Sequence, residues 1–115
     1  MTDIAILQKT LMDKNRMLYA KITEQPELIE KYGQAEHDYR VALAVKMLEL
    51  RTSGEKVTLI PDIAKGDKII ADLKLKRDIA YGVSDACREA IRAIQNSMSS
   101  IQTLISSRRE EMKLV

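Results

Sequence analysis

Apolar residues recur at seven-residue spacing along the C-terminal half of the chain. They form two offset series, Leu73, Ala80, Cys87, Ile94 and Ile101, and Val83, Ala90, Met98 and Ile105. Two apolar series offset by three or four residues are typical of a helix that lies along another helix. Residues 67–115 contain no proline and one glycine, Gly82. The pattern therefore predicts one long helix from Asp67 to about Lys113.

The N-terminal half carries a helical pattern in two parts. The first part is an apolar stripe formed by Ile4, Leu7, Leu11, Leu18 and Ile22. Thr2 or Asp3 can cap this helix, and Gln25-Pro26 is expected to end or kink it, because a residue before proline avoids the α region. A second helix is predicted from about Pro26 to Arg51, and Thr52-Ser53-Gly54 is expected to stop it.

A connection of about 15 residues, TSGEKVTLIPDIAKG, joins the two halves. Thr58 is expected to cap one short helical turn that Gly66 ends, and Asp67 to cap the long helix. A strand over residues 57–60 is the alternative, disfavoured because it would have no partner. The matching lengths predict an all-α fold with a single helical domain over residues 1–115. Its expected form is a long antiparallel, coiled-coil-like helical hairpin with a kinked N-terminal arm. A three-helix bundle that folds back at Pro26 also satisfies the stripes.

Two apolar segments are candidates for contact with another molecule. VALAVKMLEL, residues 41–50, is apolar on nearly every side of its helix, so a second neighbour must cover it, within the chain or in an oligomer. The predicted oligomer-interface residues are Val41, Leu43, Val45, Met47 and Leu48, and a dimer is favoured because two-fold assemblies are commonest.

The second segment lies in the connection, which should face solvent. Its apolar residues either close the end of the hairpin or bind a partner protein. The predicted partner-binding residues are Val57, Leu59, Ile60, Pro61 and Ile63. Within this set we expect Leu59 and Ile63 to pack inward and Ile60 to be more exposed.

The overall charge does not indicate a class of partner, because the 19 Lys and Arg residues are nearly balanced by 17 Asp and Glu residues. A net charge of +2 provides no strong attraction to nucleic acid or anionic lipid. Four basic residues of the long helix fall in one broad sector that could follow a phosphate backbone: Lys74, Arg77, Arg88 and Arg92. Acidic residues are interleaved with them, so a salt-bridged solvent face is the favoured interpretation.

Few residues could carry chemistry. His37 is the only histidine and has no ligand at helical spacing, so no metal site is expected. Cys87 is the only cysteine, which excludes an internal disulfide and favours a reducing cytoplasm. The chain has no phosphate-binding glycine loop and no nucleophile motif, so neither enzymatic activity nor a cofactor is expected. No run of about 18 apolar residues predicts a membrane span, and no signal peptide is expected.

The segment from Tyr39 to Ile91 resembles small helical proteins encoded by phages and prophages of Gram-positive bacteria. The resemblance rests on VTLIPDIAKGD, with Thr58, Pro61, Asp62, Gly66 and Asp67, and on ADLKLKRDIA, with Leu73, Lys76, Arg77 and Asp78. It implies an early phage gene product, often encoded near recombination and single-strand-binding functions, and supplies no catalytic residues.

We therefore expect a non-enzymatic, oligomeric adaptor or accessory factor in phage DNA recombination or replication, located in the cytoplasm of the bacterial host cell. Its expected partner is a phage or host protein of DNA metabolism. The alternatives are direct nucleic-acid binding and phage-encoded inhibition of a host enzyme.

Overall fold

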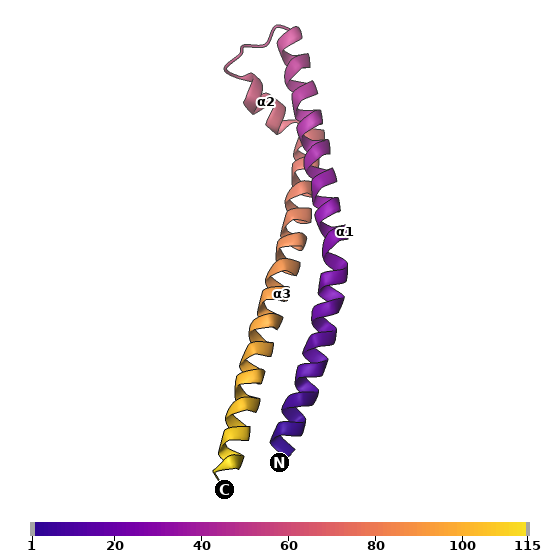
Figure 1. Cartoon of the computed structure of the whole chain (residues 1–115). Coiled ribbons are helices and arrows are strands. Elements are labelled where there is room, and N and C mark those ends of the chain that lie inside the picture. Colours follow the sequence, from indigo (N-terminus) through magenta and orange to yellow (C-terminus); the bar gives the residue numbers. More distant parts are fainter. Residues whose placement is uncertain (1, 115) are drawn as a thin grey trace. The chain divides into compact units, whose positions relative to one another are not determined.

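The computed structural model describes residues 2–114, and nearly all of them are helical (Figure 1). Helix α1 spans Thr2–Thr52, α2 spans Ile60–Gly66 and α3 spans Lys68–Lys113. The predicted all-α class is confirmed, and no strand occurs within residues 2–114. Residues 57–59 form a turn rather than the alternative strand.

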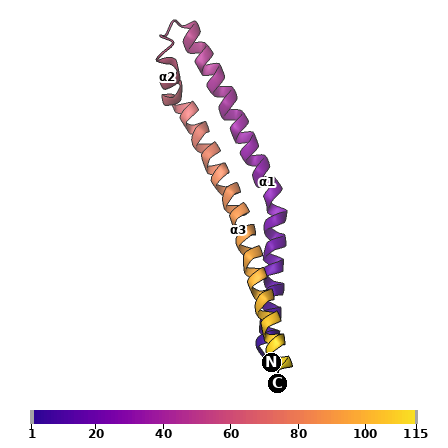
Figure 2. The same ribbon diagram turned by 60° about the vertical axis from the view of Figure 1, so that its left-hand side comes forward.

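The contacts divide the chain into two compact units. One unit pairs the described residues up to Pro26 of α1 with those from Ala86 onward in α3. The other unit, Glu27–Asp85, contains the rest of α1, the connection with α2, and the start of α3. In each unit α1 and α3 run antiparallel (Figures 1 and 2). The predicted helical hairpin is confirmed over the three-helix bundle, whereas the single domain stays a prediction.

A regular seam of alternating three- and four-residue steps runs along α1. The seam residues, all buried or half-buried, are Ile4, Leu7, Leu11, Lys14, Leu18, Lys21, Gln25, Leu28, Tyr32, Ala35, Tyr39, Ala42 and Lys46. The predicted stripe is right at its first four positions and wrong at Ile22, which is 42% exposed. The contact positions between two such helices repeat every 3.5 residues. After Leu18 the next positions on the seam are therefore Lys21 and Gln25, and Ile22 lies beside it.

Helix α1 continues through Pro26, so the predicted division into two helices is wrong. Proline has no N–H to donate to the carbonyl of Ile22, and a proline inside a helix costs about 3 kcal/mol. The seam continues on both sides, with Leu18 before the proline and Leu28 after it. We infer that packing along this seam outweighs the local cost.

The seam of α3 follows the same rule. Its members are Ile70, Leu73, Arg77, Ala80, Ser84, Cys87, Ile91, Ile94, Met98, Ile101 and Ile105. The first predicted series lies entirely on this seam. The second series is right at Met98 and Ile105 and wrong at Val83 and Ala90. Ser84 and Ile91 occupy the seam positions, and the two predicted residues each lie one residue before them, with Val83 48% exposed.

Local capping explains where the helices begin and end. Gly54 adopts a φ of +87° after α1, and the N–H of Glu55 donates to the carbonyl of Leu50 at 3.1 Å, as expected of a glycine helix stop. Asp67 caps α3 as predicted, with Oδ2 accepting from the backbone N–H of Ile69 at 3.1 Å and of Ile70 at 3.3 Å.

The predicted cap at Thr58 is wrong, because Leu59 is the N-cap of α2 and makes no side-chain capping bond. Proline stands in the first turn of α2 and lacks an N–H, so one fewer donor needs a cap there.

Candidate protein-interaction site

The connection packs one side of α2 inward. Ile60 and Ala64, four residues apart, are 5% and 0% exposed, whereas Leu59 and Ile63 are 47% and 39% exposed. The predicted assignment is therefore reversed: Ile60 is buried, and Leu59 and Ile63 face outward. Both pairs have helical i, i+4 spacing, so the sequence offers two equivalent apolar stripes. Docking of α2 against the rest of its unit selects between them.

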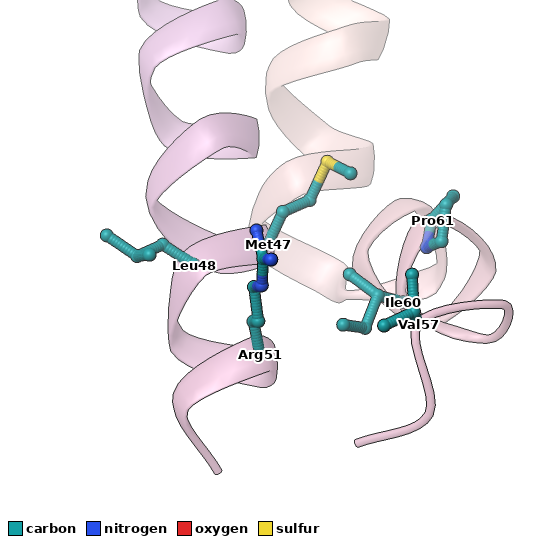
Figure 3. A pocket seen from close by; sticks show the side chains of 6 residues that line it. All are labelled: Met47, Leu48, Arg51, Val57, Ile60 and Pro61. Carbon is teal, nitrogen blue, oxygen red and sulfur yellow. The ribbon is translucent and has the colours of Figure 1, made fainter. Parts of the chain in front are cut away.

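An open groove of about 370 Å³ lies between the end of α1 and the connection. It is lined by Met47, Leu48, Arg51, Val57, Ile60 and Pro61, all within the Glu27–Asp85 unit (Figure 3). Ile60 is buried in the groove, while Val57 is 73% exposed. Three of the five predicted partner-binding residues thus line one groove, and sequence reasoning missed Arg51 because it ends a helix with no local motif.

The predicted oligomer-interface residues separate into two sets. Leu43 and Met47, four residues apart, are half-buried, and Met47 extends from α1 toward the side of α2 in Figure 3. Val41 and Val45 are each 50% exposed and Leu48 is 65% exposed. Part of the apolar surplus of residues 41–50 is therefore covered within the chain, and the rest remains open.

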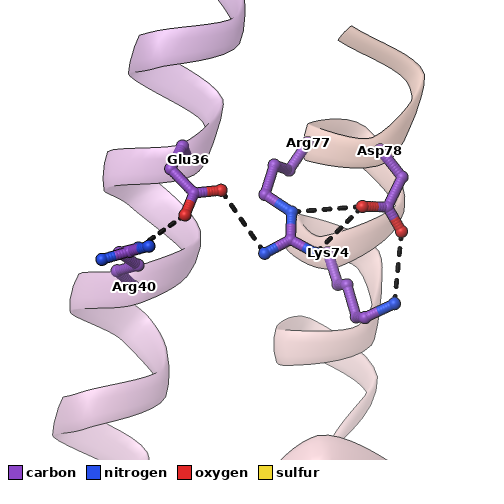
Figure 4. A network of polar contacts seen from close by, with 5 residues as sticks. All are labelled: Glu36, Arg40, Lys74, Arg77 and Asp78. Atoms are coloured by element: carbon purple, nitrogen blue, oxygen red, sulfur yellow. Dashed lines mark hydrogen bonds and ion pairs between the residues drawn. The ribbon is translucent and has the colours of Figure 1, made fainter. Parts of the chain in front are cut away.

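Arg77 belongs to a polar network inside the Glu27–Asp85 unit rather than to an open basic face (Figure 4). Its Nη1 lies 3.4 Å from Oε2 of Glu36, and its Nε and Nη2 donate to Oδ1 of Asp78 at 3.1 and 3.0 Å. Its guanidinium carbon lies 4.5 Å from the ring centroid of Tyr39. The hydrogen bond to Asp78 is the main reason that the pKa of Arg77 is raised.

Lys74 shares the same acidic partner, with Nζ 3.2 Å from Oδ2 of Asp78. Hydrogen bonds from Arg77 first and from Lys74 second lower the pKa of Asp78. In the other unit, Arg88 and Arg92 lie 3.8 and 3.6 Å from one carboxylate oxygen of Glu89. These contacts favour the salt-bridged interpretation of the predicted nucleic-acid residues, and nucleic-acid binding stays a prediction.

His37 and Cys87, the single histidine and the single cysteine of the chain, lie in different surroundings. His37 has a side chain that is 69% exposed and lies 3.4 Å from Asp38. Cys87 is 4% exposed, with Sγ 3.5 Å from the backbone oxygen of Lys21. Across residues 2–114 there is no group of three or more potential metal ligands.

A search of the described helices for a membrane-spanning stretch finds none with enough length and apolar character. Comparison of the chain with protein-family models, with curated proteins and with solved structures finds no match in any of the three.

Proposed function

We propose that this chain is a non-enzymatic helical interaction protein of phage or prophage origin. In this proposal it binds a phage or host protein of DNA recombination or replication in the bacterial cytoplasm, and it self-associates. The observation that supports partner binding is the groove defined by Met47, Leu48, Arg51, Val57, Ile60 and Pro61.

The chemistry of the groove indicates what it would bind. Its volume of about 370 Å³ is at the small end of ligand sites, and it suits one or two large side chains of a protein better than a cofactor. Val57 and the half-buried Pro61 provide apolar contact over the buried Ile60, and Arg51 adds a positive charge that no ion pair among the described residues engages. The complementary partner presents an apolar side chain next to a carboxylate.

Inhibition of a host enzyme would use the same groove, so only the identity of the partner separates an inhibitor from an adaptor. Direct nucleic-acid binding has weaker support. Arg77 would have to leave both Glu36 and Asp78 to reach a phosphate, and Lys74 already lies beside Asp78.

Site-specific photo-crosslinking in infected cells tests the proposal. A photoreactive side chain at Val57 should capture a protein of DNA metabolism. The same group at Met12, which is 61% exposed and lies in the other unit, should not. The captured protein is then purified and titrated with the wild type, Val57→Asp and Met12→Asp.

We expect Val57→Asp to weaken binding by about tenfold or more, as for a residue at an interface centre, and to leave the melting temperature unchanged. Met12→Asp should bind like the wild type. Equal binding by the Val57→Asp variant would contradict the groove as the docking site. Capture of a protein with no role in DNA metabolism would contradict the proposed process.

A further inference from the structure

The Glu27–Asp85 unit has a second apolar surface. On α1 it consists of Val41 and Val45, and on α3 of Ile69, Ile79 and Val83, each between 48% and 68% exposed. Val45 and Ile69 line one shallow groove of about 300 Å³ with Ala42 and Ile70, and the groove is edged by Lys46, Glu49 and Asp67. The rows from the two helices therefore lie on the same side of the pair, and we name these five apolar residues the open face.

Two residues of opposite charge, one on each helix, lie among the apolar residues of the open face. Lys76 is seven residues from both Ile69 and Val83 on α3, and Asp38 is seven residues before Val45 on α1. Seven residues bring a helix back to nearly the same side. Val45 and Ile69 line the same groove, so counting seven residues along each helix from them places Asp38 and Lys76 at one level of the pair, next to the apolar positions. Hydrogen bonds with Gln34 first and His37 second lower the pKa of Asp38, and the charge of Lys76 adds a smaller effect in the same direction.

We propose that a second copy of this chain covers the open face about a two-fold axis parallel to the helices. A rotation about this axis does not shift residues along the helix direction. It therefore places α1 of one copy against α3 of the other, with each residue at the same height along the pair as before. Val45 then packs on the partner's Ile69, and Asp38 lies opposite the partner's Lys76. The contact is isologous, because each pairing occurs twice across the axis.

Charge disfavours one other two-fold arrangement. An axis perpendicular to the helices and centred on Asp38 and Lys76 would place α1 on α1 in the opposite direction, with Asp38 against Asp38 and Lys76 against Lys76. Like charges brought together disfavour a complex. The parallel axis instead joins Val45 to the partner's Ile69 and opposite charges at Asp38. Seven residues further along each helix it sets Lys31 opposite the partner's Val83.

The available area fits a reversible dimer. The part of α3 in this unit is about 27 Å long at about 1.5 Å per residue, and two helices each about 10 Å across make the face about 20 Å wide. Two copies would bury about 1,100 Å² in total, which just exceeds the roughly 1,000 Å² expected of a specific interface. An interface of this size lies at the small end for a specific complex, and area alone does not set affinity, so we expect a dimer that dissociates on dilution.

Charge exchange tests this geometry by sedimentation equilibrium over a range of protein concentrations. Asp38→Lys and Lys76→Asp should each weaken self-association by about tenfold, since each opposes like charges across the axis. An equimolar mixture should recover association, because Lys at position 38 of one variant then meets Asp at position 76 of the other. Repulsion within each chain persists in the mixture, so the recovery reports contacts between chains.

Apolar variants supply a matched control on one helix. Ile69→Glu should abolish the dimer, whereas Ala71→Glu should not, because Ala71 is exposed but lies about 200° around α3 from Ile69, at about 100° per residue. A wild type that is monomeric at hundreds of micromolar, or an Ala71→Glu variant as impaired as Ile69→Glu, would overturn the dimer. Unchanged association of Asp38→Lys would overturn the parallel axis.

This inference rests on the self-association included in the proposed function, and the two can fail separately. A monomeric wild type that still binds a partner through Val57 would remove the dimer and leave the adaptor. A dimer with the expected charge pattern and no partner at Val57 would do the reverse.

Discussion

Replacing Ile60 with alanine should destabilise the protein although the residue lies in a connection. Ile60 is only 5% exposed and packs where α2 meets the rest of its unit. Truncation of a buried isoleucine to alanine costs about 2–5 kcal/mol, depending on how far the site can relax. Ile60 borders an open groove rather than a closed core, so the space left behind can admit water. We therefore expect a loss near the lower limit, about 2 kcal/mol.

Urea denaturation followed by circular dichroism at 222 nm measures this loss. All samples should have the same protein concentration, because self-association would shift the apparent stability. Ile63→Ala is the matched control: the same side chain in the same helix, but 39% exposed. We expect it to cost less than about 1 kcal/mol. Thermal unfolding should show the same order, with Ile60→Ala melting about 8 °C lower than the wild type at about 4 °C per kcal/mol.

The comparison between the two isoleucines can refute the reasoning. A larger loss for Ile63→Ala than for Ile60→Ala would mean that α2 docks with its other stripe inward. No loss for either variant would mean that α2 contributes nothing to global unfolding. The groove beside Val57 would then lack a fixed wall, and the proposed docking site would lose its structural basis.

Three further variants test a helix cap and two positions inside α1. Asp67→Ala should lower the melting temperature at pH 7 but not near pH 2. The pKa of the Asp67 carboxyl is lowered chiefly by the hydrogen bond from the Ile70 N–H. Its stabilising effect is therefore full above the unfolded-state pKa of about 3.9 and is lost as the pH falls through the folded-state pKa. An equal drop in melting temperature at both pH values would contradict this. In α1, Gly33→Ala should stabilise the folded protein by about 1 kcal/mol, since an added Cβ meets nothing within 4 Å. Pro26→Ala should stabilise it by up to about 3 kcal/mol, because the helix regains a backbone donor. The urea titrations described above measure both. A gain at Gly33 but none at Pro26 would argue against a regular helix through Pro26.

The hairpin could be predicted from the sequence because its evidence is repeated many times. The seven-residue spacing of Leu73, Ala80 and Cys87 fixes one edge of the seam, and Asp67 supplies a local cap. Pro26 misled the prediction because a single local penalty is visible in the sequence. The packing along α1 that offsets it is distributed over residues far apart in the chain.

The candidate site was harder to predict, because its geometry depends on how α2 docks. Leu59 and Ile63 form one i, i+4 pair and Ile60 and Ala64 form another, and nothing local distinguishes them. The burial of Arg77 was hard to predict for a similar reason. Its salt bridges agree with the favoured interpretation of the basic residues, but the sequence placed them on a solvent face, whereas the Arg77 guanidinium lies at a seam position over the ring of Tyr39.

The placement of Val83 beside Ser84 carries the strongest argument from sequence to assembly. In α3 the seam row Ile70, Arg77 and Ser84 has a neighbouring row one residue earlier, Ile69, Lys76 and Val83, with the same seven-residue spacing. Both rows have a basic residue in the middle. The exposed row ends in Val83, whereas the buried seam row ends in Ser84. An isolated hairpin would be more stable if the valine were buried and the serine exposed. Two parallel rows are instead expected of a helix that packs against two neighbours, one of them α1. The second row therefore favours another copy of the chain as the missing neighbour.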